Sequence, residues 1–294
     1  MATRDQLLAA GVTRGHLDAQ VAGRRWRQLT SAVYVLHNGP LTERQQWWAA
    51  TLAVGPLAGR TSLQAFGIKG WPSSTVEVVV ARGAKPVLPD GVDVTVHESR
   101  RFGATDVHPV RVPPRLQLER SAVDAAAWST SPRAACGLLA AVVQQRRSTA
   151  AKLREELRAA GQVRHVRLLR VVLDDIAGGA HALSEVDLGR ICRRYGLLPP
   201  ERQLVRVDGS GKRRYVDARV SAPHGGSVLV EIDGALHLLV MSYWDDMSRG
   251  NELVISGERV LRFASIALHL DEEVVGNQLR RACGLDPIRL ARPA

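Results

Sequence analysis

The chain has 294 residues, which is more than one ordinary hydrophobic core accommodates and enough for two domains with a connector. Hydrophobic residues make up 45% of it and charged residues 23%, which excludes a chain that is disordered throughout. The net charge of +11 is uneven: residues 1–120 hold 15 basic and 9 acidic side chains, residues 121–180 hold 9 and 5, and residues 181–294 hold 16 and 15. A positive field that would attract a polyanion therefore belongs to the first 180 residues.

The sequence predicts a cytoplasmic protein without a membrane partner. No run approaches the roughly 18 apolar residues that span a bilayer. The first six residues have no apolar stretch behind their charges, so we expect no secretory signal. The three cysteines, Cys136, Cys192 and Cys283, are scattered and odd in number, which fits buried thiols in a reducing compartment.

The first residues predict a small DNA-binding module. A short helix is expected to end at Gly11, and a second helix to begin after Thr13 as its N-cap. The alternating residues 29–36 predict a strand. Helix, turn, helix and β-ribbon together predict a winged helix-turn-helix over residues 1–40, whose second helix would enter the major groove.

The second helix has an inner and an outer face. Its periodicity directs Val12, Leu17 and Val21 inward and leaves Arg14 and Gln20 outward. Arginine pairs with guanine and glutamine with adenine in the major groove. We therefore predict that Arg14 and Gln20 read base edges.

A basic corner follows this helix at Arg24, Arg25 and Arg27. Cations between a helix and a wing are placed to neutralise DNA phosphates, with an affinity that falls steeply with salt. The alternative is a solvated basic turn with Trp26 packed into the core.

Several stretches of residues 3–130 resemble a known family; they are DQLLAAGVT from Asp5, GRRWRQL from Gly23, AVYVL from Ala32, RQQWWAA from Arg44, Gly70-Trp71 and VEVVVARG from Val76. They are similar to the N-terminal domain of AbiE-type (type IV) antitoxins, which are winged-helix proteins that repress their own operon and counter a nucleotidyltransferase-like toxin. The resemblance implies double-stranded DNA as a partner, and such a toxin as a second partner.

Residues 41–177 predict an antitoxin-like region of mixed helices and strands. The expected helices and strands are helices near 41–54 and 61–66, strands at 75–81 and 92–97, and helices at 118–128, 132–145 and 149–160. Gly178 and Gly179 are the best candidates for a linker.

From residue 181 to 294 the pattern changes to a second domain. It predicts a helix at 184–195, strands at 202–207, 215–220 and 228–232, a helix at 239–255 and a strand at 260–263. The expected fold class is therefore α+β, with a C-terminal α/β domain built on a central mixed sheet.

Acidic residues in this domain form a candidate metal site. Asp217 lies in one predicted strand, Glu231 and Asp233 end the next, and Glu185 lies near the start of the preceding helix. Neighbouring strands can bring Asp217 and Glu231 together as oxygen ligands for Mg²⁺, and Glu231 and Asp233 share one face of their strand. The alternative is a set of exposed acids at strand ends and turns.

The same domain resembles the PD-(D/E)xK restriction-endonuclease-like superfamily, and within it the very-short-patch-repair-like branch. The resemblance rests on Ser184-Glu185, Arg214–Asp217, Glu231–His237, Asp246–Arg249 and Arg259–Phe263. It implies that Asp217 and Glu231 are metal carboxylates and that His237 is the histidine of the repair-like branch. Asp233 stands where the family has lysine, so Arg262 or His237 would have to supply the positive charge if cleavage is retained.

Three hypotheses remain open from the sequence. The first is a DNA-binding, antitoxin-like regulator whose endonuclease-like domain is structural or accessory. The second is a metal-dependent DNA endonuclease targeted by its winged helix. The third is an interaction protein that neutralises a toxin by contact.

Overall fold

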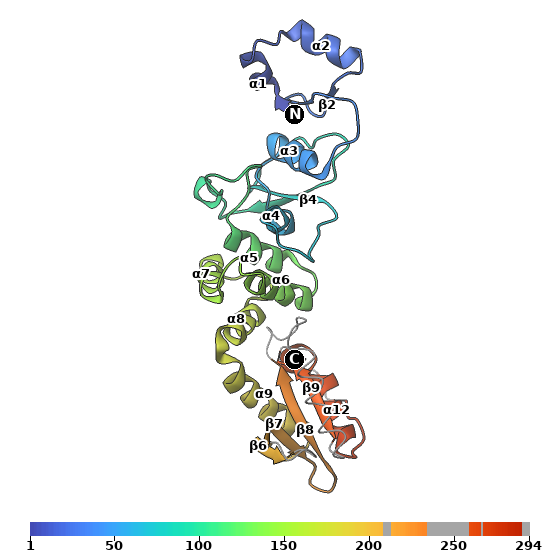
Figure 1. Cartoon of the computed structure of the whole chain (residues 1–294), viewed down its shortest axis with the longest axis vertical. Coiled ribbons are helices and arrows are strands. Elements are labelled where there is room, and N and C mark those ends of the chain that lie inside the picture. The colour runs from blue at the N-terminus through green and yellow to red at the C-terminus, as the bar shows by residue number, and fades with distance from the viewer. Residues whose placement is uncertain (208–212, 234–258, 266, 290–294) are drawn as a thin grey trace. The chain divides into compact units, whose positions relative to one another are not determined.

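The chain folds into two compact α+β units. The computed structural model describes residues 1–207, 213–233, 259–265 and 267–289 (Figure 1). Unit 1 comprises Met1–Thr130 with Ala141–Arg164, and unit 2 comprises Ser131–Ala140 with His165–Ala294. Both units combine helices with a sheet, which confirms the expected class at that level. Within the described residues, every helix is too short or too polar to cross a bilayer.

Unit 1 begins with two helices and a three-stranded antiparallel sheet: β1 (Ala2–Thr3), α1 (Arg4–Ala9), α2 (Arg14–Ala22), β2 (Arg27–Gln28) and β3 (Val33–Val35), in the order β1-β3-β2. The turn between the helices passes through Gly11 at φ +85°, a conformation that glycine adopts without steric cost. Thr13 Oγ1 accepts the N–H of His16 at 3.2 Å, which confirms Thr13 as the N-cap of α2.

The continuous strand predicted over residues 29–36 is wrong, because the chain turns within it. Thr30 Oγ1 accepts the N–H groups of Ala32 and Val33, both at 3.1 Å. The N–H of Leu29 donates to the Val33 carbonyl at 2.9 Å. A threonine hydroxyl that captures nearby backbone donors favours a turn over a strand. The result is a hairpin of β2 and β3.

Strand β3 has two buried faces. Tyr34 packs with Leu7 and Leu17 of the two helices. Val33 and Val35 point the other way, into a larger core that continues into the rest of unit 1. Alternation of side chains along a strand explains this division. The first forty residues are thus joined to the rest of unit 1 by a shared hydrophobic core.

The rest of unit 1 is a parallel strand pair among helices: α3 (Glu43–Ala53), α4 (Gly59–Ala65), β4 (Val76–Ala81), β5 (Val94–Ser99), the short 3₁₀ helix η1 (Ala104–Asp106), α5 (Leu118–Trp128) and α7 (Ala150–Ala160), with α6 (Pro132–Gln144) belonging partly to each unit.

Unit 1 also contains a network of ion pairs. Arg120 donates to Asp124 at 2.6 Å and to Asp106 at 3.2 Å, and Arg101 donates to Asp124 at 3.0 Å. The buried carboxylate of Asp124 is therefore already paired with two arginines.

The linker expected at Gly178 and Gly179 is not a loop. The chain runs from α8 (Val166–Asp174) through a π-helical segment, η2 (Asp175–Gly179), into α9 (Ala180–Arg194). The two glycines therefore fall in an irregular but helical turn, a kind of irregularity that interrupts α-helices locally without ending them.

Unit 2 contains the predicted mixed sheet: β6 (Glu201–Val207), β7 (Arg213–Ser221), β8 (Ser227–Asp233) and β9 (Val260–Ala264), in the order β6-β7-β8-β9. The first three strands are antiparallel, and β8 and β9 are parallel. The helices α11 (Ala267–Leu270) and α12 (Glu272–Ala282) come after β9. The helix predicted at 239–255 lies outside the described residues.

The core of unit 2 joins α9 and α12 to the sheet. Tyr195 is 2% exposed, and a Cβ built on Gly276 of α12 would lie 2.5 Å from its ring. Only glycine allows this close approach. Glu272 accepts from Arg190 at 2.6 Å and from Arg194 at 2.9 Å, which ties α12 to α9. Burial would raise the pKa of Glu272, but these two arginines outweigh it and lower the pKa below its usual value.

Candidate nucleic-acid interface and carboxylate site

The outer face of α2 presents a cation to solvent. Leu17 is 2% exposed and packs with the partly buried Val12 and Val21, as its spacing predicts. Arg14 lies in the first turn on the exposed side. An exposed arginine at the start of the second helix is where a major-groove contact is made in helix-turn-helix proteins.

Gln20 is less available than its position on the helix suggests. Its Oε1 accepts from Arg25 Nε at 2.6 Å, and its Nε2 lies 3.1 Å from His16 Nε2. In this arrangement the amide orients Arg25. Base recognition by Gln20 would require these contacts to break.

The corner after α2 is held by its own backbone. The N–H groups of Arg25 and Trp26 both donate to the Gln20 carbonyl, at 3.0 and 3.2 Å. Arg24 takes a left-handed conformation at φ +53°, which is uncommon for a residue with a side chain. Arg24 and Arg25 are both exposed. The turn therefore leaves two neighbouring arginines exposed, with the Arg25 guanidinium hydrogen-bonded to Gln20 of α2.

Arg27 behaves differently from its two neighbours. It is half-buried, and its Nη2 donates to the Gly39 carbonyl at 2.9 Å. This contact fastens the end of the hairpin to the chain that leads into α3. Trp26 is also partly buried, packed with the helices and edge-on to His16 at a centroid distance of 5.8 Å. The corner thus combines an anchored Trp26 and Arg27 with an exposed Arg24 and Arg25.

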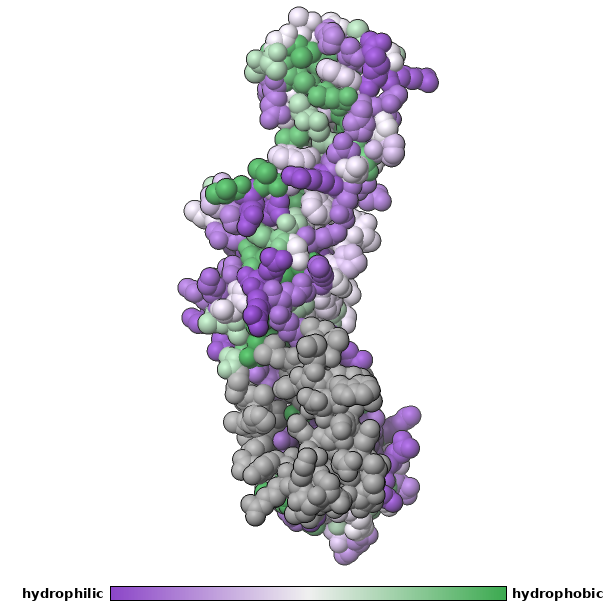
Figure 2. Space-filling view, viewed as in Figure 1, coloured by the Kyte–Doolittle hydropathy of each residue, from purple (hydrophilic) through white to green (hydrophobic). Residues whose placement is uncertain are grey.

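Arg4 is a basic residue of this surface that the sequence did not single out. It is exposed at the start of α1, and its Nη2 donates to the Tyr34 hydroxyl at 2.9 Å. That hydrogen bond raises the pKa of Arg4. Figure 2 shows hydrophilic side chains gathered over α2 and the segment after it, with apolar residues visible between the helices and the sheet.

Asp217 comes directly before Ala218, the residue of β7 at which the pairing with β8 ends. That ladder runs from Ser221↔Ser227 to Ala218↔Val230. Asp217 Oδ2 then accepts the N–H of Ile232 at 2.7 Å. The carboxylate therefore takes the place of a main-chain acceptor at this point of the sheet, which gives it a structural role whatever else it does.

Glu231 is paired with a cation on the next strand. It stands opposite Arg262 in the parallel β8–β9 register, and Arg262 Nη2 lies 2.7 Å from Glu231 Oε2. The structure thus places Asp217 and Glu231 on neighbouring strands, as the sequence predicts. It also places a positive charge beside Glu231, which opposes the binding of a divalent cation at that oxygen.

The remaining acidic candidates are located only in part. Asp233 ends β8 opposite Ala264, and Glu185 lies within α9, both placed by their main chain. His237 lies outside the described residues. Among the residues that the structure describes, three or more histidine, cysteine or acidic side chains do not gather in a metal-binding group. Asp217 and Glu231 offer the oxygen ligands that Mg²⁺ uses, but each has a partner within the protein.

A second basic feature of unit 1 was missed by sequence reasoning. Four arginines, a histidine and several apolar side chains line a pocket of about 640 Å³. They come from helices and loops far apart in the chain, so no local pattern reports them. The RQQWWAA stretch, in which an arginine is followed by two tryptophans, is the one sequence signal that could have pointed to this pocket.

Comparison with known proteins adds no relative: no family model matches the chain, and no curated protein matches it either.

Proposed function

We propose that the chain binds double-stranded DNA through its N-terminal helices and hairpin, as a regulator of the antitoxin type. The observation that carries the proposal is the set of exposed guanidinium groups on the second helix and the turn after it: Arg14, Arg24 and Arg25. Within the described residues none of the three is paired with a carboxylate.

The architecture supports the proposal in a second way. Two short helices joined by a tight turn, followed by an antiparallel hairpin, are the parts of a winged helix-turn-helix. The second helix would lie in the major groove with Arg14 toward base edges, while Arg24 and Arg25 contact phosphates. The resemblance of residues 3–130 to AbiE-type antitoxins supports the regulatory role and makes a nucleotidyltransferase-like toxin the partner to seek.

The direct test compares DNA affinity in two double variants of equal charge. Arg24→Ala/Arg25→Ala removes the exposed corner, and Arg82→Ala/Arg158→Ala removes two other exposed arginines of unit 1. Charge-assisted hydrogen bonds are worth about 1.5–3 kcal/mol each, so the loss of two should weaken the binding of duplex DNA by about 100-fold or more, measured by fluorescence anisotropy.

The control separates a contact from a general loss of charge. The Arg82→Ala/Arg158→Ala protein should bind DNA within about twofold of the wild type. Equal weakening in both double variants would contradict a defined interface at the corner. Circular dichroism of each variant checks that unit 1 remains folded.

A second candidate function is metal-dependent cleavage of DNA by unit 2. It is favoured by one observation: Asp217 and Glu231 lie on neighbouring strands of a mixed sheet with Arg262 beside them. If it holds, the wild type nicks plasmid DNA with Mg²⁺ or Mn²⁺ and Glu231→Gln does not. DNA binding without cleavage under either metal leaves unit 2 a structural or accessory domain.

A further inference from the structure

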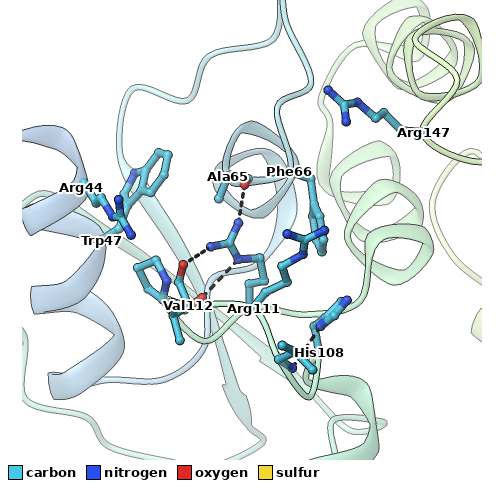
Figure 3. Close-up of a pocket in the computed structure, with 11 residues that line it drawn as sticks. Arg44, Trp47, Ala65, Phe66, His108, Arg111, Val112 and Arg147 are labelled. Atoms are coloured by element: carbon cyan, nitrogen blue, oxygen red, sulfur yellow. Dashed lines mark hydrogen bonds between the residues drawn. The ribbon is translucent and has the colours of Figure 1, made fainter.

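The pocket of unit 1 is walled by cations and apolar groups together. It is about 640 Å³ in volume, within the range of small-molecule sites. Figure 3 shows Arg44 and Trp47 at one side of it and Arg147 at another, with Phe66, His108 and Arg111 between. None of the described residues that line it is acidic.

Arg115 forms a fixed floor. It is 4% exposed, and its Nε and Nη2 donate to the Pro113 and Val112 carbonyls at 3.1 and 2.6 Å, while its Nη1 donates to the Ala65 carbonyl. Its guanidinium lies over the ring of Phe66, 5.4 Å from the centroid. Three neutral carbonyls satisfy its donors but leave its charge uncompensated. The floor is therefore rigid and positive.

Two exposed arginines, Arg44 and Arg111, add positive charge near Arg115. Burial lowers the pKa of Arg115, and the positive charges of Arg111 and Arg44 lower it further. Both exposed guanidinium groups thus repel the Arg115 guanidinium. Arg111 and Arg44 are both exposed at the surface of the pocket, where a bound anion would relieve this repulsion.

The remainder of the lining is apolar and partly aromatic. Trp47 and Phe66 are half-buried, and Val110 and Val112 are 78% and 57% exposed. Large apolar side chains left open beside a cluster of arginines suit a ligand with both an anionic and a flat apolar part. Aromatic rings and guanidinium planes stack on nucleobases, and guanidinium forks bind phosphates.

We propose that this pocket binds a free nucleotide, with its phosphates on Arg44 and Arg111 and its base against the apolar wall that includes Trp47 and Phe66. Inorganic phosphate alone would leave most of the volume and the entire apolar wall unused. The site is separate from the DNA-binding corner, so the two proposals can fail independently.

Calorimetric titration of the full chain tests the proposal with matched ligands. ATP and GTP carry both parts, tripolyphosphate carries only the anion, and adenosine carries the base and its ribose without a phosphate. We expect at least one of the two nucleotides to bind tenfold or more tightly than either fragment. Equal affinity for tripolyphosphate would reduce the pocket to a general anion site and overturn the proposal, as would no binding of either nucleotide.

Two variants and a control locate the binding. Arg44 and Arg111 are exposed and lie at the rim of the pocket, so Arg44→Gln and Arg111→Gln should each leave the fold intact and weaken nucleotide binding by tenfold or more. Arg82→Gln, an exposed arginine outside the pocket, should change it by less than twofold. Equal loss in all three proteins would show attraction by net charge alone and would overturn the assignment.

The last arm separates a free nucleotide from a DNA strand. A short duplex is added to the nucleotide-loaded protein, and DNA affinity of Arg111→Gln is measured in parallel. We expect nucleotide binding to persist and DNA affinity to stay within about twofold of the wild type. The proposal is overturned if DNA displaces the nucleotide and Arg111→Gln weakens the affinity for both ligands equally. The pocket would then be a contact for the DNA backbone.

Discussion

The two units differ in how certain of their arginines are partnered. In unit 2, Arg190 and Arg194 share the carboxylate of Glu272, and Arg262 is paired with Glu231. In unit 1, the exposed arginines of the corner and of the pocket face solvent without an acidic partner among the described residues. Exposed, unpaired cations are available to a polyanion, whereas paired ones are neutralised within the fold.

The interior of unit 1 explains part of this difference. Its acids Asp124 and Asp106 are bound to Arg120, and Glu77 is bound to Arg60. Because each of these carboxylates already has an arginine partner, it is not available to the exposed arginines of the corner and the pocket.

The largest expected effect breaks that internal pairing. Arg120→Ala leaves the buried carboxylate of Asp124 without its closest partner, at 2.6 Å. Removing one member of a buried ion pair costs about 3–5 kcal/mol, so the free energy of unfolding of unit 1 should fall by that amount in urea titrations. Arg82→Ala, an exposed arginine, should change it by no more than about 0.5 kcal/mol. Similar small losses in both variants would show that the network does not stabilise unit 1.

An intermediate effect tests whether the functions of the units are separate. Gly276→Ala places a methyl group where the ring of Tyr195 lies, 2.5 Å away. Overpacking of this kind costs about 1–3 kcal/mol, which should appear in the unfolding of unit 2 alone. DNA affinity should not change, because the proposed interface belongs to unit 1. A matching loss of DNA binding would contradict the assignment of that function to unit 1.

The smallest expected effect concerns pH and unit 1. Burial lowers the pKa of His97 below 6.5, although Glu77 and Asp124 act in the opposite direction and Arg60 in the same one. Below pH 6.5 the unfolded chain therefore binds more protons than the folded one, and stability falls as the pH drops. His97 stacks on Trp128 at 3.5 Å, so His97→Phe retains a stacking ring that cannot be protonated. The variant should lose stability less steeply than the wild type between about pH 7 and pH 5; identical slopes would exclude His97 as the cause.

Local signals in the sequence were sufficient for most of the secondary structure. Thr13 as a cap and Gly11 as a turn residue act on their nearest neighbours, so the helix boundaries of the first module could be predicted. The strand expected at 29–36 failed because apolar alternation does not reveal that the Thr30 hydroxyl captures two backbone donors. The glycine pair at 178–179 lies in a π-helical turn, because a helix continues through it, and its role as a linker stays a prediction.

The candidate sites were predictable only where adjacent residues create them. The corner of Arg24 and Arg25 is such a case, whereas the inward contact of Arg27 with Gly39 depends on how the hairpin meets the next segment of the chain. Asp217 and Glu231 were placed on neighbouring strands by counting residues, but their actual partners, Ile232 and Arg262, depend on the register of three strands.

The salt dependence of DNA affinity tests the central claim most directly. We expect the logarithm of the association constant to fall linearly with the logarithm of salt concentration between about 50 and 200 mM. Each phosphate contact contributes about 0.9 to that slope, so Arg24→Ala/Arg25→Ala should flatten it by about 1.8, while Arg82→Ala/Arg158→Ala leaves it unchanged. A slope that is the same in the wild type and the corner variant would contradict DNA binding through this surface.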